Sequence, residues 1–259
     1  MNPQTLDSVA DFIFSEFSTN ADTVYYQDFM VNSVRYRNVI AVFGKQNQNT
    51  LVVGAHYDVC GMQQGADDNA SGIVGLLELS RLLKGRKFSR RIELVAYTLE
   101  EPPFFRTENM GSYIHARSLH KKNMDVEGMI SLEMIGYFKE ARGTQDYPIK
   151  LMKMFYGSRG NYIAVVNKTK KGIFARQFTK HFKQSSTIPV KSISAPRSIP
   201  GIDFSDHLNY WNFGFSALMI TDTAFYRNKN YHQQSDTIDT LDLSNMAAVI
   251  QAVFEVLIQ

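Results

Sequence analysis

The hydrophobic pattern at the start of the chain predicts a helix, a hairpin and a buried strand. Apolar residues near the N-terminus recur at the spacing of one helix face: Leu6, Val9, Phe12, Ile13 and Phe17. Two β-rich runs follow over residues 25–31 and 36–43, and the polar residues between them indicate a hairpin turn. Residues 50–56 (TLVVGAH) are almost all apolar, which is typical of a strand covered on both faces.

Predicted strands and helices alternate along the rest of the chain. We expect helices over residues 70–83, 111–122, 172–183 and 245–258. We expect strands over residues 91–99, 128–132, 162–166, 190–195 and 217–221. Residues 138–156 are less regular and are expected to form an excursion over one face. The alternation favours an α/β fold, and we predict one domain over residues 1–259: a three-layer αβα sandwich around a mixed, mostly parallel central sheet.

Composition excludes several classes of protein. The 28 Lys and Arg against 25 Asp and Glu give a formal charge of +3, which is too small to indicate a nucleic-acid partner. Cys60 is the single cysteine, so an intrachain disulfide is excluded. No apolar run reaches the roughly 18 residues that a membrane helix needs. The N-terminal segment carries no signal-like leader, so we expect a cytoplasmic protein, or a secreted or periplasmic one if a leader was trimmed.

Residues with metal-binding side chains follow four of the predicted strands. In chain order they are His56 and Asp58, Glu100 and Glu101, Glu133, and His232. In open α/β sheets, ligands collect outside the carboxyl ends of the strands. We therefore expect all of these side chains on one rim of the sheet.

The segment 65–72 (GADDNASG) adds Asp67 and Asp68 just before a predicted helix. Taken alone, two Asp residues there would favour a simple helix cap. Taken with the strand ends, they complete a set of two imidazoles and three carboxylates: His56, Asp68, Glu101, Glu133 and His232. These donors suit zinc, cobalt or manganese. Carboxylates crowded on a partly buried rim would repel one another unless cations neutralised them, which two divalent ions would do.

The order of these motifs resembles that of the zinc-dependent exopeptidases of metallopeptidase family twenty-eight, which include bacterial leucyl aminopeptidase and glutamate carboxypeptidase. The matching motifs are GAHYD (54–58), GADDNASG (65–72), TLEE (98–101), SLEMIGY (131–137), SDH (205–207) and YHQQSDT (231–237). The resemblance implies two divalent ions, normally zinc. His56 and Glu133 would hold one ion, Glu101 and His232 the other, and Asp68 would bridge them.

The resemblance also implies catalytic roles. Glu100 would be the general base that takes a proton from the nucleophilic water and passes it to the leaving amine. Asp58 would accept the second ring N–H of His56 and so fix its tautomer. Tyr231 would donate a hydrogen bond to the oxyanion, as a Tyr does in carboxypeptidases of the family.

Four further residues have open interpretations. Asp206, in the SDH motif, is expected in the wall of the substrate pocket. Arg227 either meets a substrate carboxylate or is a surface charge. Asp236 either braces the loop of His232 or caps a helix. Cys60 either lies near the site or is a buried, inert thiol.

The leading hypothesis is a di-zinc aminopeptidase that removes N-terminal residues from peptides. Aminopeptidases of the family usually have Asp at the position of Glu133. A Glu at this position resembles carboxypeptidases and single-zinc glutaminyl cyclases instead. Ile202 stands near the place of an aminopeptidase Tyr. A carboxypeptidase and a single-zinc glutaminyl cyclase-like acyltransferase are therefore alternatives, and a non-catalytic binding module ranks last. The sequence indicates no oligomeric state.

Overall fold

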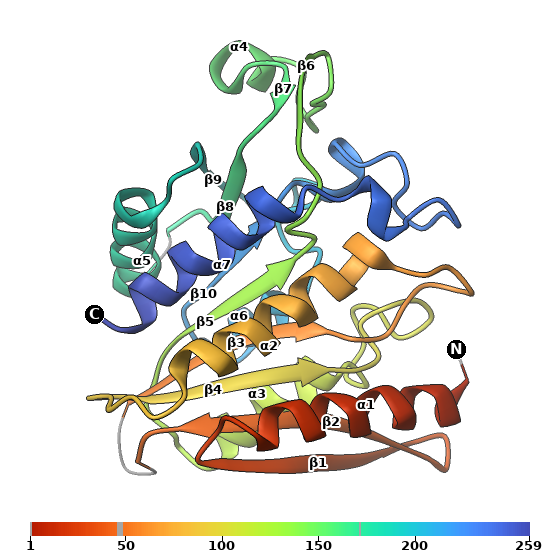
Figure 1. Cartoon of the computed structure of the whole chain (residues 1–259), viewed down its shortest axis with the longest axis vertical. Helices are drawn as coiled ribbons and strands as arrows, with labels where there is room; N and C mark the ends of the chain where they lie inside the picture. The colour runs from red at the N-terminus through yellow and green to blue at the C-terminus, as the bar shows by residue number, and fades with distance from the viewer. Residues whose placement is uncertain (1, 46–48, 171) are drawn as a thin grey trace.

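A mixed eight-stranded sheet lies at the centre of the molecule (Figure 1). The computed structural model describes residues 2–45, 49–170 and 172–259. Each sheet strand lies within two residues of its predicted bounds at either end. In spatial order the strands are β1 (Thr23–Val31), β2 (Val34–Phe43), β4 (Arg91–Tyr97), β3 (Thr50–His56), β5 (Val126–Glu133), β10 (Ala217–Thr221), β8 (Ile163–Lys168) and β9 (Val190–Ala195).

The middle of the sheet is parallel. Neighbours β4, β3, β5 and β10 all run in one direction, whereas β2 and β8 pair with them antiparallel at either side. In this register His56 pairs with Tyr97, and Glu133 pairs with Thr221. The parallel strands therefore end at the same edge of the sheet. The loops that follow these strands therefore start from one edge.

Gly54 allows an aromatic side chain to pack across β3. A Cβ atom at this position would lie 2.2 Å from Cε2 of Tyr97. The Tyr97 side chain is fully buried, and its hydroxyl lies 2.7 Å from the hydroxyl of Tyr210. The Tyr97 ring therefore packs directly on β3 at Gly54, two residues before His56 at the carboxyl end of the strand.

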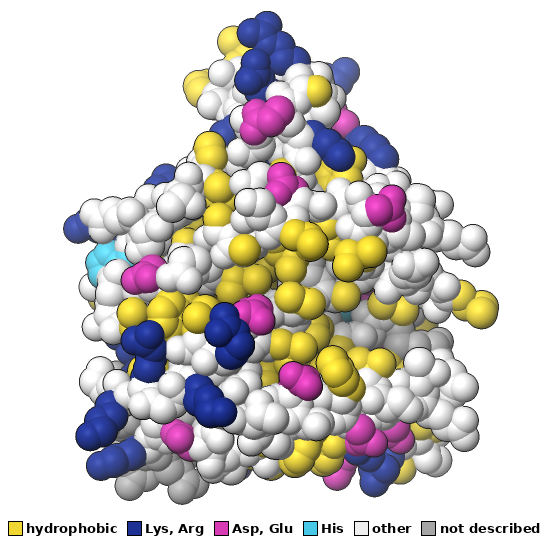
Figure 2. Space-filling model, in the orientation of Figure 1, with side chains coloured by type: hydrophobic (Ala, Val, Ile, Leu, Met, Phe, Trp, Pro, Cys, Tyr) yellow, Lys and Arg dark blue, Asp and Glu magenta, His cyan; other side chains and the backbone are white. Residues whose placement is uncertain are grey.

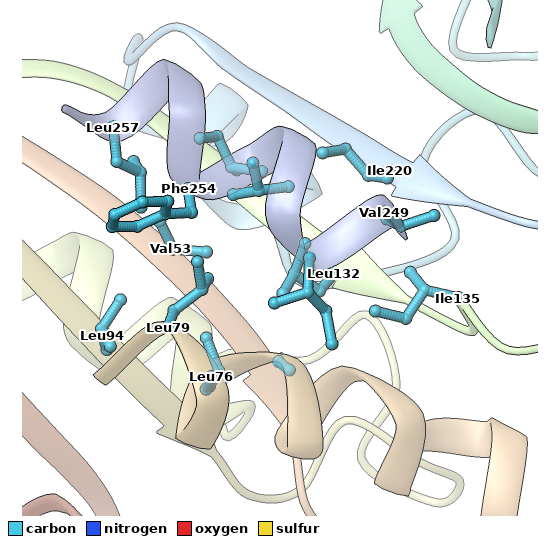
Figure 3. Packing of buried hydrophobic residues seen from close by; sticks show 14 of the residues in the cluster. Val53, Leu76, Leu79, Leu94, Leu132, Ile135, Ile220, Val249, Phe254 and Leu257 are labelled. Atoms are coloured by element: carbon cyan, nitrogen blue, oxygen red, sulfur yellow. The ribbon is translucent and has the colours of Figure 1, made fainter. Parts of the chain in front are cut away.

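Helices cover both faces of the sheet, which confirms the three-layer αβα sandwich. One face is covered by α1 (Pro3–Ser18), α2 (Gly72–Leu83), α5 (Ile173–Ser185) and α7 (Leu243–Leu257). Their apolar side chains interlock with those of the strands, as Figure 3 shows for α2 and α7. The other face carries α3 (Gly111–Lys121) and α6 (His207–Asn212). Within the described part of the chain, no helix is long and apolar enough to cross a membrane.

The sequence pattern does not predict α6. Five of its six residues are buried, so the segment HLNYWN has no polar face that would show a helical period. The pattern also places the start of α2 too early, at residue 70. The backbone at Asp68 and Asn69 is not helical, and the regular helix begins only at Gly72.

The irregular segment 138–156 does not lie over a face of the sheet. It forms part of a projection with the short strands β6 (Lys139–Arg142) and β7 (Arg159–Gly160) and the helix α4 (Met152–Tyr156), which stands out from the body at the top of Figure 1. Figure 2 shows Lys and Arg side chains gathered at its tip. Met154 and Phe155 are largely exposed there. The remaining short helical turns are η1 (Ala66–Ser71), η2 (Ala224–Tyr226) and η3 (Ile238–Thr240).

Two phenylalanines of α1 provide a matched test of the packing. Phe17 is fully buried in the core, whereas Phe12 is 57% exposed although both fit the helical pattern. Phe17→Ala should lower the free energy of unfolding by about 3–5 kcal/mol, because it removes a buried ring and leaves a cavity. Phe12→Ala should change it by less than about 1 kcal/mol. Chemical denaturation measures both, and equal losses in the two variants would contradict this packing.

Candidate metal centre

The five predicted ligands meet at the carboxyl edge of the parallel strands. His56 and Glu133 are the last residues of β3 and β5, and Glu101 lies in the loop after β4. Asp68 lies in η1, just before α2, and His232 lies in the loop between η2 and η3. Four of the five residues are at most 6% exposed, and His232 is partly buried.

The distances divide these ligands into two groups that share Asp68. The Nε2 atom of His56 lies 3.5 Å from Oδ1 of Asp68 and 3.4 Å from Oε2 of Glu133. The Nε2 atom of His232 lies 3.1 Å from Oδ2 of Asp68 and 3.2 Å from Oε2 of Glu101. Each oxygen of Asp68 therefore faces a different histidine.

Several of these buried atoms lack a hydrogen-bond partner: Nε2 of His56, Oδ2 of Asp68, Oε1 of Glu101 and Nε2 of His232. Buried polar atoms in folded proteins are almost always paired, so a cluster of unpaired ones needs an explanation. Imidazole nitrogen and carboxylate oxygen are zinc donors, and the atoms of His56, Asp68 and Glu133 lie within 4.8 Å of one another. The residues present therefore fit the binding of zinc.

The electrostatics of the site favour positive charge. Burial lowers the pKa of His56, but Glu133 and Glu100 more than reverse this and raise it well above the ordinary value. For His232, the adjacent carboxylates of Asp68 and Glu101 overcome the effect of burial and raise the pKa to about 10. Burial raises the pKa of Glu101 to about 7. All three shifts favour a bound proton, so this cluster of carboxylates favours positive charge in its midst, which bound cations would supply.

Asp58 positions the pair of glutamates. Its two carboxylate oxygens accept the backbone N–H groups of Glu100 at 3.2 Å and of Glu101 at 3.0 Å. Its carboxylate also lies 3.5 Å from Nδ1 of His56, but its own main-chain carbonyl is closer, at 3.0 Å. The predicted support of His56 therefore comes foremost from the backbone of Asp58, while the side chain orients the next loop.

Asp236 ties the loop of His232 to that of Asp68. Its two oxygens accept the backbone N–H groups of Asp67 and Asp68, each at 3.0 Å. These two N–H groups belong to the first turn of η1, so Asp236 both braces the loop and caps that turn, whereas Thr237 precedes η3. Asp236 therefore braces the backbone of Asp68, the residue whose carboxylate faces both histidines.

Sequence reasoning missed two polar partners of the site. The Oγ atom of Ser205 donates to Oε2 of Glu133 at 2.8 Å. The amide of Asn69 donates to the carbonyl of Leu132 at 2.9 Å and accepts the N–H of Met134 at 3.0 Å. Both residues lie inside motifs that the sequence displays, but their contacts cross more than 60 positions of the chain and depend on the fold.

Unusual backbone conformations cluster around the ligands. Leu99, Met134 and His232 have φ angles of 61°, 51° and 57°, in the left-handed region that non-glycine residues rarely adopt. Leu99 precedes Glu100, and Met134 follows Glu133. Such conformations concentrate at functional sites, where the surrounding structure holds them.

The two predicted substrate-binding residues do not line the cavities of the site. Asp206 is fully buried, and burial raises the pKa of its carboxyl group to about 7. Arg227 is 2% exposed, so the surface-charge interpretation is wrong. Its guanidinium donates to Oε1 of Gln145 at 2.8 Å and to the carbonyl of Tyr137 at 3.1 Å. Arg227 therefore anchors the base of the projection, because these buried acceptors require a donor.

Two adjoining cavities open beside the ligands. The first is lined by Asp68, Glu100, Glu101, Glu133 and His232, together with Pro102, Phe105, Phe204, Phe225 and Tyr231. The second is mainly apolar and shares Glu133, Phe204, Phe225 and Tyr231 with the first. Its further walls include Ile149, Met152, Ile193, Ile202 and Met219. Neither lining contains a Lys or Arg among the residues that the structure describes.

Tyr231 stands at the junction of these cavities. Its ring stacks on His232 with the centroids 3.8 Å apart and an angle of 19° between the planes. Phe225 lies on another side, at 5.5 Å between centroids. The residue predicted to stabilise an oxyanion is thus held beside the ligand set.

Comparison with known proteins places the chain among peptidases. The model of peptidase family M28 matches residues 38–257. The uncharacterised protein YfbL of Escherichia coli (strain K12) is 44% identical, over 99% of this chain and 81% of YfbL. A probable leucine aminopeptidase of Trichophyton verrucosum (strain HKI 0517) is 26% identical, over 83% of this chain. The chain spans only 55% of that relative's length.

Two solved structures share the fold. The LapA aminopeptidase of Legionella pneumophila matches with a TM-score of 0.74 and 21% identity, over 100% of this chain and 67% of LapA. A glutaminyl cyclase of Tannerella forsythia matches with a TM-score of 0.69 and 19% identity, over 98% of this chain and 90% of the cyclase. At these identities the likeness shows the fold alone. The family match over most of the chain, by contrast, shows that this protein belongs to peptidase family M28 and is a zinc metallopeptidase.

Proposed function

We propose that this protein is a co-catalytic di-zinc aminopeptidase. The observation that carries the proposal is the placement of Asp68, whose two oxygens face different histidines at 3.5 Å and 3.1 Å. A single ion would need only one of these oxygens. His56 with Glu133 and His232 with Glu101 give each ion its own imidazole and carboxylate, and Asp68 serves both.

Glu100 acts as the general base. Ions held by this site would lower the pKa of a shared water and polarise the scissile carbonyl. Glu100 lines the same cavity, with Oε2 4.0 Å from Nε2 of His56, and Asp58 fixes its backbone. Burial raises the pKa of its carboxyl group well above the ordinary value. This raised pKa suits a group that takes a proton from the nucleophile and gives it to the leaving amine.

Tyr231 and the apolar cavity bind the substrate around the reacting carbonyl. The Tyr231 side chain lines both cavities and is fixed against His232, which suits a donor to the developing oxyanion. The apolar cavity begins at Glu133 and receives the side chain of the terminal residue. Burial of an apolar side chain there favours substrates such as leucyl peptides.

The charge of the cavities favours an amino terminus over a carboxyl terminus. The lining includes the carboxylates of Glu100, Glu101 and Glu133. It includes no Lys or Arg from the described residues, and the candidate cation Arg227 is engaged elsewhere. With the ions bound, the ligand carboxylates would be neutralised, but the lining would still offer no Lys or Arg to pair with a substrate α-carboxylate, whereas an α-ammonium group requires no such partner. This supports an aminopeptidase over a carboxypeptidase.

The first test replaces the general base. Glu100→Gln keeps the size of the side chain but removes its ability to accept a proton. We expect kcat/KM for leucine p-nitroanilide to fall by about 10²–10⁴-fold, with the zinc content unchanged. Kinetics and elemental analysis of the same preparation measure both quantities. Full activity in this variant would eliminate Glu100 as the base.

The number of ions distinguishes this proposal from a single-zinc cyclase. Elemental analysis of the wild type should find two zinc ions per chain, and His56→Ala and His232→Ala should each lose one, since each removes a different imidazole. His120→Ala, which alters an exposed histidine of α3, is the control and should keep both. One ion in the wild type, together with cyclisation of N-terminal glutamine, would favour the cyclase alternative.

The substrate terminus is tested with three compounds. Leucine p-nitroanilide should be hydrolysed because it has a free α-amine and no α-carboxylate that would need a cation from the lining. N-acetyl-leucine p-nitroanilide and an N-acylated dipeptide with a free carboxyl group should both be refractory. Release of the C-terminal residue from the dipeptide would assign a carboxypeptidase instead.

A further inference from the structure

The single cysteine lies beside one half of the metal centre. Cys60 follows β3 on the loop that carries Asp58 and is partly exposed. Its Sγ atom, a carboxylate oxygen of Glu101 and a ring nitrogen of His232 all lie within 4.8 Å of one another. The ligands of the other half, His56 and Glu133, have no sulfur neighbour of this kind, because the chain has one cysteine.

A buried carboxylate atom of Glu101, which belongs to the same group as the thiol, lacks a partner and indicates a ligand on this side of the centre. Glu101 is 4% exposed and contacts His232 through Oε2 at 3.2 Å. Its second oxygen, Oε1, is buried without a hydrogen-bond partner, as is Oδ2 of Asp68. An ion at this position would have four donors from the protein: the thiol sulfur of Cys60, the imidazole of His232 and the carboxylates of Glu101 and Asp68.

We propose that Cys60 is a thiolate ligand of the ion at the His232 position. This inference rests on the proposed metal centre and adds to it a donor that the other position lacks. On ligation the thiol releases its proton to solvent, and the sulfur lone pair occupies a position in the shell of the ion. A soft thiolate beside an imidazole favours zinc over magnesium or manganese, so the two positions differ in selectivity.

Four donors are also the number of protein ligands that a closed zinc site uses. Structural zinc sites are closed in this way, whereas catalytic sites keep one position open. Cys60 would therefore complete the set of protein donors in the resting protein, and its release would leave a position open for water or substrate. The loop position suits this exchange, since Cys60 is partly exposed and the adjacent Met62 is 96% exposed.

Cobalt spectroscopy tests the ligation directly. The wild type and the variants Cys60→Ser and Cys60→Ala would be stripped of metal and titrated with Co²⁺. We expect a thiolate-to-cobalt charge-transfer band in the near ultraviolet in the wild type and its loss in both variants, while the visible cobalt bands remain. Bound cobalt with the same spectrum in all three proteins would overturn the role of Cys60 and leave the metal centre intact. Failure of all three to bind cobalt would overturn both.

Alkylation of the thiol gives a second readout that does not depend on activity. Iodoacetamide should modify Cys60 about tenfold more slowly, or slower still, in the zinc-loaded protein than after chelation, because a ligated sulfur is a poor nucleophile. The matched control is the double variant Cys60→Ser, Met62→Cys, which moves the single thiol to an exposed position on the same loop. Its labelling rate should not respond to zinc. Equal rates for Cys60 with and without zinc would contradict the proposal.

Discussion

The shared carboxylate of Asp68 is the interaction on which the site depends. Its two oxygens face two histidines that lie far apart in the sequence, and each histidine belongs to a different half of the site. Much of the nearby structure keeps Asp68 in place: Asp236 accepts its backbone N–H, and Asn69 connects the same turn to the end of β5. Burial in this setting is destabilising for a cluster of carboxylates unless cations accompany it. Zinc bound at this site would therefore stabilise the folded state.

The parallel centre of the sheet explains how the chain assembles this site. Strands β4, β3, β5 and β10 deliver their following loops to one edge, while the close packing of Tyr97 on Gly54 fixes the strand that ends in His56. The same edge carries an apolar cavity whose outer wall is built by the projection, and Arg227 fastens that projection from beneath. The apolar cavity and the cavity of the ligands thus share Glu133 and Tyr231 in their linings.

The sheet and the ligand set could be predicted from sequence because their signals are local. Each ligand follows a short apolar strand or a turn motif, and the order of these motifs is specific to one family. The supporting contacts could not be predicted, because they depend on tertiary distances. Arg227 donates a hydrogen bond to Gln145, 82 positions away. The carboxylate of Asp58 accepts the backbone N–H of Glu101, whereas His56 is contacted foremost by the main-chain carbonyl of Asp58. Helix α6 was missed for a related reason, since a segment buried on all sides shows no period.

Anomalous diffraction from crystals of the zinc-loaded protein, collected on both sides of the zinc absorption edge, tests the central claim most directly. The account predicts two anomalous peaks flanking Asp68, one next to His56 and Glu133 and the other next to His232 and Glu101. A single peak, or a second peak away from Asp68, would contradict the proposed pair of ions that share this carboxylate.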